Sequence, residues 1–226
     1  MAVELAELLR ERGEDPVAIS ADALQVYRGL ETLTGVASGP EQERLEHRLV
    51  GFVPVTETFS VGDYMPLAHR EIDAALDAGR RPIVVGGTGL YVRAALAELS
   101  LRKAGPGRES ELWSPQTRRP TILFGLTMER ERLYERIERR VEAIVTGGAE
   151  EEVLAAAALG PSRTARVALG FQELLEGDVE AMKKRSRKLA KRQLTWMRKM
   201  AGLLEVDVTD RAPREVAAGL MERLRA

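Results

Sequence analysis

The sequence RPIVVGGTGLY at residues 81–91 is the clearest strand and turn signal in this 226-residue chain. A short apolar run that ends in glycines is typical of a buried strand. A helical pattern follows Tyr91 and continues to Leu99, so the glycine turn joins a strand to a helix. Glycine in such a turn lets backbone N–H groups approach an anion at the helix N-terminus. A tight turn without a ligand explains the same glycines equally well, because neither a Walker A loop nor a G-x-G-x-x-G fingerprint is present.

Short apolar segments alternate with helical ones along the chain, which indicates a parallel α/β sheet followed by a helical C-terminal part. The predicted strands are residues 16–20, 49–55, 81–85 and 121–126. Helices are predicted over residues 2–12, 63–78, 92–99, 129–145, 150–159, 171–176, 179–200 and 214–225, and a loop over 32–40. We expect an α/β core over 1–100, a linker over 101–120, and the last core strand with a helical part over 121–226.

Composition excludes several classes of protein. The chain has 34 Lys and Arg against 35 Asp and Glu, and it has no Cys. A disulfide scaffold, a Cys-based zinc site and a thiol nucleophile are therefore excluded. The apolar stretches are too short to span a membrane, and the sequence does not begin like a signal peptide, so we expect a cytoplasmic protein. His47 and His69 are isolated, which gives no metal-ligand spacing.

Basic residues are concentrated in one segment. Residues 183–199 (KKRSRKLAKRQLTWMRK) contain nine Lys and Arg and no acid, so the remainder of the chain has a charge of −1 − 9 = −10. A solvated helix face is one explanation. The absence of acids at i,i+4 and an apolar stripe at helical spacing (Ala190, Leu194, Met197) favour a polyanion partner instead. Hydrogen-bonding and stacking groups lie beside the charges: Gln193, Thr195 and Trp196. We therefore expect nucleic acid binding.

Two further features keep alternatives open. Asp22 follows the first predicted strand, where open α/β sheets carry their site residues, but Asp is also a common helix cap. Arg136, Arg139 and Arg140 share one helix face, and the spacing by itself favours a salt-bridged surface with Glu135 and Glu138.

Five segments, read in order, resemble motifs of one family. They are residues 19–30 (ISADALQVYRGL), 84–91 (VVGGTGLY), 133–141 (LYERIERRV), 168–174 (ALGFQEL) and 189–198 (LAKRQLTWMR). The corresponding family patterns are I-S-[AV]-D-S-x-Q-V-Y-[RK]-G-[LM], V-G-G-T-G-L-Y, L-Y-x-R-I-x-x-R-V, A-I-G-Y-K-E-L and Y-A-K-R-Q-x-T-W-F-R. Together they resemble the bacterial tRNA dimethylallyltransferases, also called tRNA isopentenyltransferases or IPP transferases.

The resemblance implies a P-loop-NTPase-like parallel sheet and a monomer. It also implies transfer of a dimethylallyl group from dimethylallyl diphosphate to N6 of the adenosine 3′ of the anticodon in tRNA, with Mg²⁺ at the diphosphate. Asp22 would be the general base, and Arg140 would stabilise the diphosphate leaving group. The residues implied in contact with the tRNA anticodon arm are Asp22, Ala23, Leu24, Gln25, Thr88, Lys191, Arg192 and Gln193.

The sequence departs from the family pattern in two places. The phosphate-binding loop G-P-T-[AG]-[ST]-G-K-[ST], with the strand before it, does not occur ahead of the helix at 2–12, and a short linker near 101–111 replaces an inserted tRNA-binding segment. Without the first strand, we expect exposed edges in the parallel sheet. Without the loop, we expect these 226 residues to be weakly active or inactive. The alternative functions are a non-catalytic RNA-binding remnant of the family and, less favoured by the basic helix, a small-molecule kinase.

Overall fold

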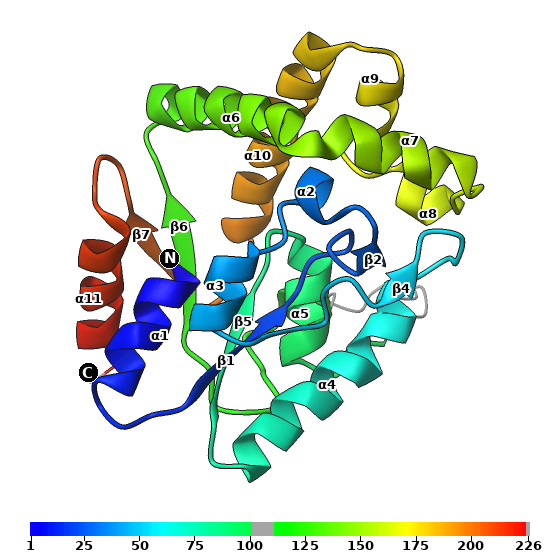
Figure 1. Cartoon of the computed structure of the whole chain (residues 1–226). Helices are drawn as coiled ribbons and strands as arrows, with labels where there is room; N and C mark the ends of the chain where they lie inside the picture. The colour runs from blue at the N-terminus through cyan, green and yellow to red at the C-terminus, as the bar shows by residue number, and fades with distance from the viewer. Residues whose placement is uncertain (101–110, 225–226) are drawn as a thin grey trace.

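A computed structural model describes residues 1–100 and 111–224 of the chain. Parallel strands form a core, with helices on both faces and a separate helical layer above it (Figure 1). The strands are β1 (Pro16–Ser20), β2 (Tyr27–Arg28), β3 (His47–Arg48), β4 (Val53–Pro54), β5 (Arg81–Val85), β6 (Leu123–Thr127) and β7 (Leu203–Asp207). The helices are α1 (Ala2–Arg10), α2 (Glu31–Thr34), α3 (Gly39–Arg44), α4 (Val61–Asp77), α5 (Gly89–Leu96), α6 (Arg130–Ile144), α7 (Glu150–Ala158), α8 (Arg163–Arg166), α9 (Phe171–Leu175), α10 (Val179–Met197) and α11 (Pro213–Arg223).

Strand β1 is the centre of the main sheet, which has the order β3-β1-β5 with parallel pairing throughout. All five residues of β1 are buried, because successive side chains point to opposite covered faces. Ala18 packs with α1, whereas Ile19 packs with Tyr64 of α4 and Tyr91 of α5. The register places Ser20 beside Val85, so β1 and β5 end at the same edge of the sheet.

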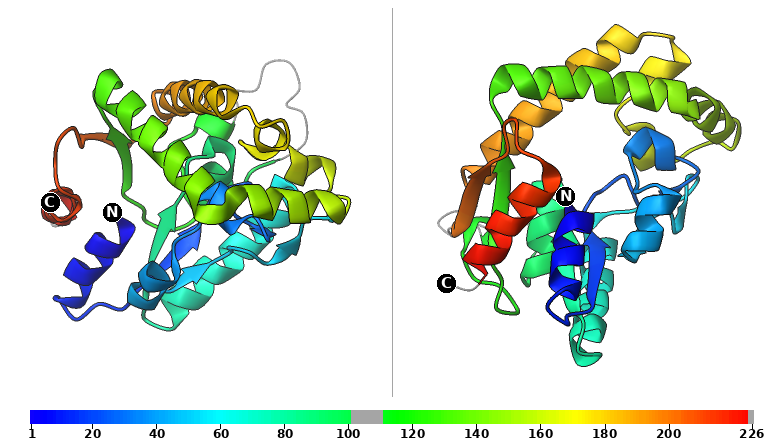
Figure 2. Two further views of the ribbon diagram at one scale, coloured as in Figure 1. Left: turned by 45° about the horizontal axis from the view of Figure 1, so that its top comes forward. Right: turned by 60° about the vertical axis from the view of Figure 1, so that its left-hand side comes forward.

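A second parallel pair, β6-β7, forms its own sheet. Helix α11 packs on this pair and also against α1, so the two sheets are joined through the helices (Figure 2). Strand β5 is an edge of the main sheet within the described residues, and its Val85 is 42% exposed. The predicted P-loop-NTPase-like parallel α/β class is confirmed, and the sheet has an exposed edge as expected.

The helical layer, which consists of helices α6 to α10, shares a hydrophobic core with the sheet part of the chain, residues 1–100. Tyr27 and Leu30 are buried together with Val141 of α6, Val153 of α7 and Phe171 of α9. Figure 1 shows α6 and α7 across the top of the core, with α10 descending from that layer towards the end of β5. Helices α6 and α7 are joined by a π-helical turn, Val145–Ala149. Of the expected linker, residues 101–110 lie outside the described residues.

Several predicted elements differ from the structure. Of the strand predicted over 49–55, only β4 at its end is present, because Leu49 and Gly51 have positive φ angles of 61° and 59° that break extended backbone. The strand that pairs with β1 in the main sheet is β3, which lies just before Leu49 in the sequence. Strand β4 pairs with β2 and is not part of the main sheet. The loop predicted over 32–40 includes most of α2 and the beginning of α3, which Ser38 and Glu41 begin with a capping box. Strand β7 was not predicted. No helix in the described ranges is long and apolar enough to cross a membrane.

Candidate active site

A cavity of about 1180 Å³ lies between the end of the main sheet, α6 and α10. It is lined by groups that are far apart in the sequence. Asp22 and Gln25 come from the segment after β1, and Gly86 and Gly87 from the turn after β5. Helix α6 contributes Arg136, Arg139 and Arg140, and α10 contributes Gln193, Leu194 and Met197. The structure therefore brings together five predicted site residues: Asp22, Leu24, Gln25, Arg140 and Gln193.

Asp22 lies just beyond the end of β1 and is half-buried at the cavity. Its Oδ1 accepts a hydrogen bond of 2.9 Å from the backbone N–H of Leu24. The carboxylate thus stabilises a turn, and the alternative of a helix cap is wrong because the next helix begins at Glu31. Its Oδ2 has no hydrogen-bond partner among the described residues, so this atom is available to accept a proton from a ligand in the cavity.

Two buried tyrosines lie behind Asp22. The hydroxyl of Tyr64 donates to the Ser20 carbonyl oxygen at 2.9 Å, and the rings of Tyr64 and Tyr91 are 4.6 Å apart between centroids. Burial raises the pKa of Tyr91 to about 12 and raises the pKa of Tyr64 further above its ordinary value, with the Asp22 carboxylate as a smaller contribution to both. Both phenols are therefore neutral at neutral pH. Asp22 is the carboxylate beyond this end of β1 that lines the cavity.

Gln25 is held by hydrogen bonds at both ends of its side-chain amide. Its Oε1 accepts from the Ser20 hydroxyl at 2.8 Å. Its Nε2 donates to the carbonyl oxygens of Thr34 and Gly35, at 3.5 and 3.0 Å. Because both ends are bound, the orientation of Gln25 in the cavity is fixed. Ala23, by contrast, is partly buried against the hydrophobic core and does not line the cavity.

The glycines of the turn after β5 permit close packing with other parts of this chain. A β-carbon at Gly86 would collide with the Ala21 backbone, one at Gly87 with the Gln193 amide, and one at Gly89 with the Trp196 indole. These contacts explain the glycines without an anion, in agreement with the ligand-free alternative. Thr88 lies between them at the N-cap of α5, and its hydroxyl has no hydrogen-bond partner among the described residues.

Arg136, Arg139 and Arg140 of α6 do not form the salt-bridged surface that their spacing favoured. Glu135 pairs with Arg132 at 3.0 Å, and Glu138 pairs with Arg187 of α10 at 3.1 Å. Consequently Arg136, Arg139 and Arg140 have no ion pair within the described chain, and all three line the cavity. Arg136 and Arg139 were not predicted as site residues. Their i, i+3, i+4 spacing with Arg140 was the available signal.

The nine basic residues of the segment at 183–199 divide into three that form ion pairs and six that do not. Lys183 pairs with Glu142 and Glu180, Arg185 with Glu173, and Arg187 with Glu138. For these three residues, the structural explanation of their charge is correct. Six others are exposed and have no ion pair in the described part of the chain: Lys184, Lys188, Lys191, Arg192, Arg198 and Lys199.

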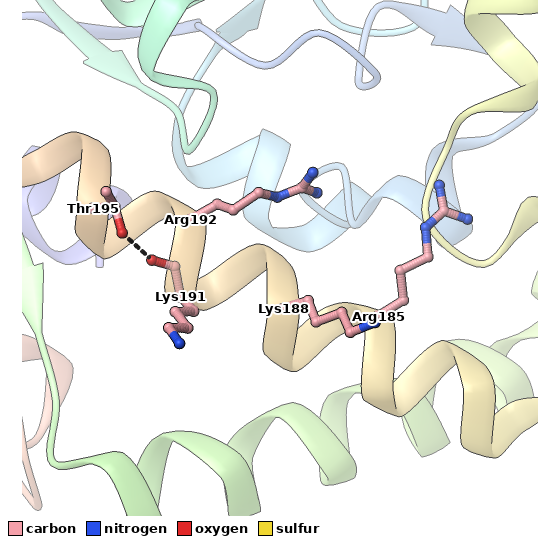
Figure 3. A pocket seen from close by; sticks show the side chains of 5 residues that line it. All are labelled: Arg185, Lys188, Lys191, Arg192 and Thr195. Carbon is pink, nitrogen blue, oxygen red and sulfur yellow. Dashed lines mark hydrogen bonds between the residues drawn. The ribbon is translucent and has the colours of Figure 1, made fainter.

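A shallow pocket of about 400 Å³ follows the exposed side of α10 and is lined by Arg185, Lys188, Lys191, Arg192 and Thr195. Figure 3 shows Arg185 and Arg192 extending to one side of the helix and Lys191 to the other. Lys191 and Arg192 therefore lie outside the central cavity, although their neighbour Gln193 lines it. Trp196 also contacts a residue that sequence analysis missed, Trp113, at 4.9 Å between ring centroids.

A protein-only magnesium site is not present in the described residues, which hold no group of three or more His, Cys, Asp and Glu side chains suited to a metal ion. The carboxylates that line the cavity are Asp22, Glu135 and Asp210. Glu135 and Asp210 both pair with Arg132, so Asp22 is the one carboxylate of this cavity lining that has no ion pair in the described residues. The residues therefore do not fit Mg²⁺ as a resident ion, and the expectation of Mg²⁺ rests on the resemblance alone.

Comparison with known proteins identifies the family. The chain matches the IPP transferase family model over residues 25–119 and 105–200. It is 34% identical to a tRNA dimethylallyltransferase of Streptomyces griseus over 81% of this chain and 79% of that one. It is 31% identical to that of Desulforudis audaxviator, over 85% and 84%. The crystal structure of a tRNA isopentenylpyrophosphate transferase from Bacillus halodurans superposes with a TM-score of 0.84 at 28% identity, covering 99% of this chain and 90% of that one. The chain therefore belongs to the IPP transferase family.

Proposed function

We propose that this protein transfers a dimethylallyl group from dimethylallyl diphosphate to N6 of the adenosine 3′ of the anticodon in tRNA. One observation carries the proposal most directly. Asp22, a half-buried carboxylate with a free oxygen, shares one cavity with the unpaired arginines of α6. A proton acceptor and a cationic anion site in the same cavity suit a reaction in which an amine displaces diphosphate.

In this reaction, the bond from N6 to the allylic carbon forms as the bond from that carbon to the diphosphate oxygen breaks. The proton released by N6 goes to Oδ2 of Asp22, and the electron pair leaves with the diphosphate. Arg140, together with Arg136 and Arg139, would stabilise the charge that develops on the diphosphate. The adenine must leave its stack to reach Asp22, because an aromatic amine inside a stacked loop is inaccessible.

Contacts to tRNA are proposed for two regions. Leu24, Gln25 and Gln193 line the cavity, where a flipped base would lie. The unpaired cations of α10, including Lys191 and Arg192, are exposed outside the cavity and suit phosphate contacts. Thr88 has a free hydroxyl beside the same turn. Ala23 is partly buried against the core, and we propose no more for it than a backbone contact. A monomeric state remains a prediction.

A non-catalytic RNA-binding protein is the second candidate, favoured by one observation. The unpaired cations of α10 that line the shallow pocket lie outside the cavity, so RNA binding there does not need the diphosphate site. The two candidates differ in turnover and not in affinity for RNA.

Transfer of a labelled dimethylallyl group to an unmodified tRNA anticodon arm tests the proposal. The assay compares the unaltered chain with its Asp22→Asn variant. We expect transfer by the first and little by the second, because asparagine cannot accept the N6 proton. RNA binding without transfer by the unaltered chain would establish the second candidate.

A further inference from the structure

Glu152 of α7 is bound to the backbone of α2, a single helical turn that belongs to the sheet part of the molecule. Its Oε1 accepts from the N–H of Thr32 at 2.9 Å, and its Oε2 accepts from the N–H of Leu33 at 3.0 Å. The first N–H groups of a helix have no partner within the helix. One carboxylate from the helical layer therefore satisfies two of these donors in α2.

The other end of the same turn holds Gln25. The carbonyl oxygens of Thr34 and Gly35 accept from Gln25 Nε2. These are the carbonyl groups that a helix leaves without partners at its C-terminus. The orientation of the Gln25 amide in the cavity therefore depends on where the carbonyl end of α2 lies.

Arg140 contacts the same end of α2. Its guanidinium lies in the space that a β-carbon at Gly35 would occupy, and Gly35 has a φ of +66° that favours glycine. One backbone residue thus supports two groups of the proposed site: the Gln25 amide on one side and the Arg140 guanidinium on the other.

A turn of four residues, Glu31–Thr34, is too short to be stable as an isolated helix. Within the turn itself, Thr34 Oγ1 donates back to the Leu30 carbonyl oxygen at 2.8 Å, and Leu33 is buried at 3% exposure. The Thr34 hydrogen bond lies within the turn, and the burial of Leu33 is not a polar contact. The two hydrogen bonds of Glu152 therefore fix the amide end of the turn relative to α7.

We propose that Glu152 is a positioning residue for the site: by holding the amide end of α2, it sets the carbonyl end that orients Gln25 and supports Arg140. It does not line the cavity and acts through α2. The role in catalysis rests on the proposed function, whereas the mechanical connection from Glu152 to Gln25 is independent of it.

The variant Glu152→Gln tests the connection, because it removes the charge and replaces one acceptor oxygen with an N–H₂ group that faces a backbone donor. Glu151→Gln is the matched control, since Glu151 is the exposed neighbour without a hydrogen bond or ion pair in the described ranges. We expect the Thr32 and Leu33 amides to exchange with solvent about tenfold faster or more in Glu152→Gln. We also expect the NMR resonances of the Gln25 side-chain amide to move towards those of a free glutamine. Glu151→Gln should change neither.

The connection is overturned if the Gln25 resonances stay in place in Glu152→Gln while the protein remains folded by circular dichroism. If Glu152→Gln unfolds, Glu152→Asp replaces it, because that variant keeps the carboxylate and is one methylene shorter. If the Gln25 resonances of Glu152→Asp move from their wild-type positions towards those of a free glutamine, the connection is supported. If they stay at their wild-type positions, it is contradicted.

A double-mutant cycle separates positioning from general stability. With the chain and labelled substrate of the transfer assay, we expect Glu152→Gln to lower kcat about tenfold or more in the wild-type background and much less in Gln25→Ala. Equal losses in both backgrounds would show that Glu152 does not act through Gln25. If the unaltered protein transfers nothing, the proposed function fails, and the NMR comparison still decides the connection.

Discussion

The indole ring of Trp196 lies directly against Gly89, in the space that a β-carbon at position 89 would fill. Gln193 has the same relationship to Gly87, one turn earlier on α10. Trp113 also packs on Trp196, and the Lys199 ammonium lies 5.2 Å from the centre of the Trp113 ring. The turn after β5 and the end of α10 are therefore one packed unit, which fixes Gln193 in the cavity beside Gly87.

Replacement of Gly89 by alanine should displace α10. The new methyl group would overlap the Trp196 ring, and overpacking of this kind costs about 1–3 kcal/mol. Urea unfolding followed by tryptophan fluorescence measures the loss. Gly39→Ala is the matched control, because a β-carbon there meets open space at the beginning of α3. Similar unfolding free energies for the two variants would show that the close approach at Gly89 is unimportant.

The paired and unpaired residues of the basic segment should respond differently to neutralisation. One triple variant changes Lys188, Lys191 and Arg192 to Gln, and the other changes Lys183, Arg185 and Arg187 to Gln. The first set is unpaired, so we expect weaker binding of a tRNA anticodon arm with an unchanged melting temperature. Its salt dependence should also fall, by about 0.7 in the slope of log K against log salt for each phosphate that the variant no longer neutralises.

The second set should lower the melting temperature, because it breaks ion pairs with α6 and α9. Arg185 matters most, since its partner Glu173 is only 8% exposed and would be left as a buried charge. Calorimetry and fluorescence anisotropy, applied to both triple variants, measure the two effects. If only the second triple variant loses RNA affinity, the assignment of RNA binding to the unpaired cations is wrong.

Asp22→Asn should abolish most of the transfer and leave binding intact. Asparagine retains Oδ1 as the acceptor for the Leu24 N–H, so the turn is preserved, but it cannot accept the N6 proton. General-base catalysis is worth about 10²–10⁴ in rate, and we expect kcat to fall by that factor. Asp77→Asn, at the exposed end of α4, is the control and should be unaffected. A rate for Asp22→Asn within a few-fold of wild type would show that Asp22 is not the base.

Local patterns predicted the parts of the fold that local chemistry determines. The strand at 16–20 and the strand, turn and helix around Gly86–Gly89 lie where they were predicted, because an apolar run and glycines act within a few residues. Strand β7 was missed since three of its five residues are exposed, so it lacks the continuous burial of β1. The positive φ of Leu49, which ends β3, could not be predicted, because leucine rarely adopts this backbone conformation.

The sequence named several residues of the cavity, but not the contacts that hold them. Asp22, Gln25, Arg140 and Gln193 line one cavity, and the roles that the resemblance implies for them stay predictions. Which cations are free could not be predicted, because their acidic partners come from distant segments; Lys183, for example, binds Glu142 of α6. For the same reason, no local pattern indicated that α2 is bound by an acid from α7.

The buried tyrosine pair behind Asp22 should make the protein sensitive to alkali. Burial raises the pKa of Tyr91 to about 12, and it raises the pKa of Tyr64 in the same direction, so the folded state favours both neutral phenols. Their contribution to stability is complete below pH 10, the value near which unfolded tyrosine ionises, and it is lost as the pH rises from there towards 12. Urea unfolding between pH 8 and pH 11.5 measures this decline.

Tyr64→Phe and Tyr91→Phe should each flatten that decline, because phenylalanine cannot ionise. At neutral pH, Tyr64→Phe should also cost about 1 kcal/mol, since it removes the hydrogen bond to the Ser20 carbonyl oxygen. Tyr91→Phe should cost less, because no hydrogen bond from the Tyr91 hydroxyl occurs within the described residues. If a protein with both changes loses stability above pH 10 as steeply as wild type, the alkaline sensitivity originates elsewhere, and the neutral phenols behind Asp22 do not account for it.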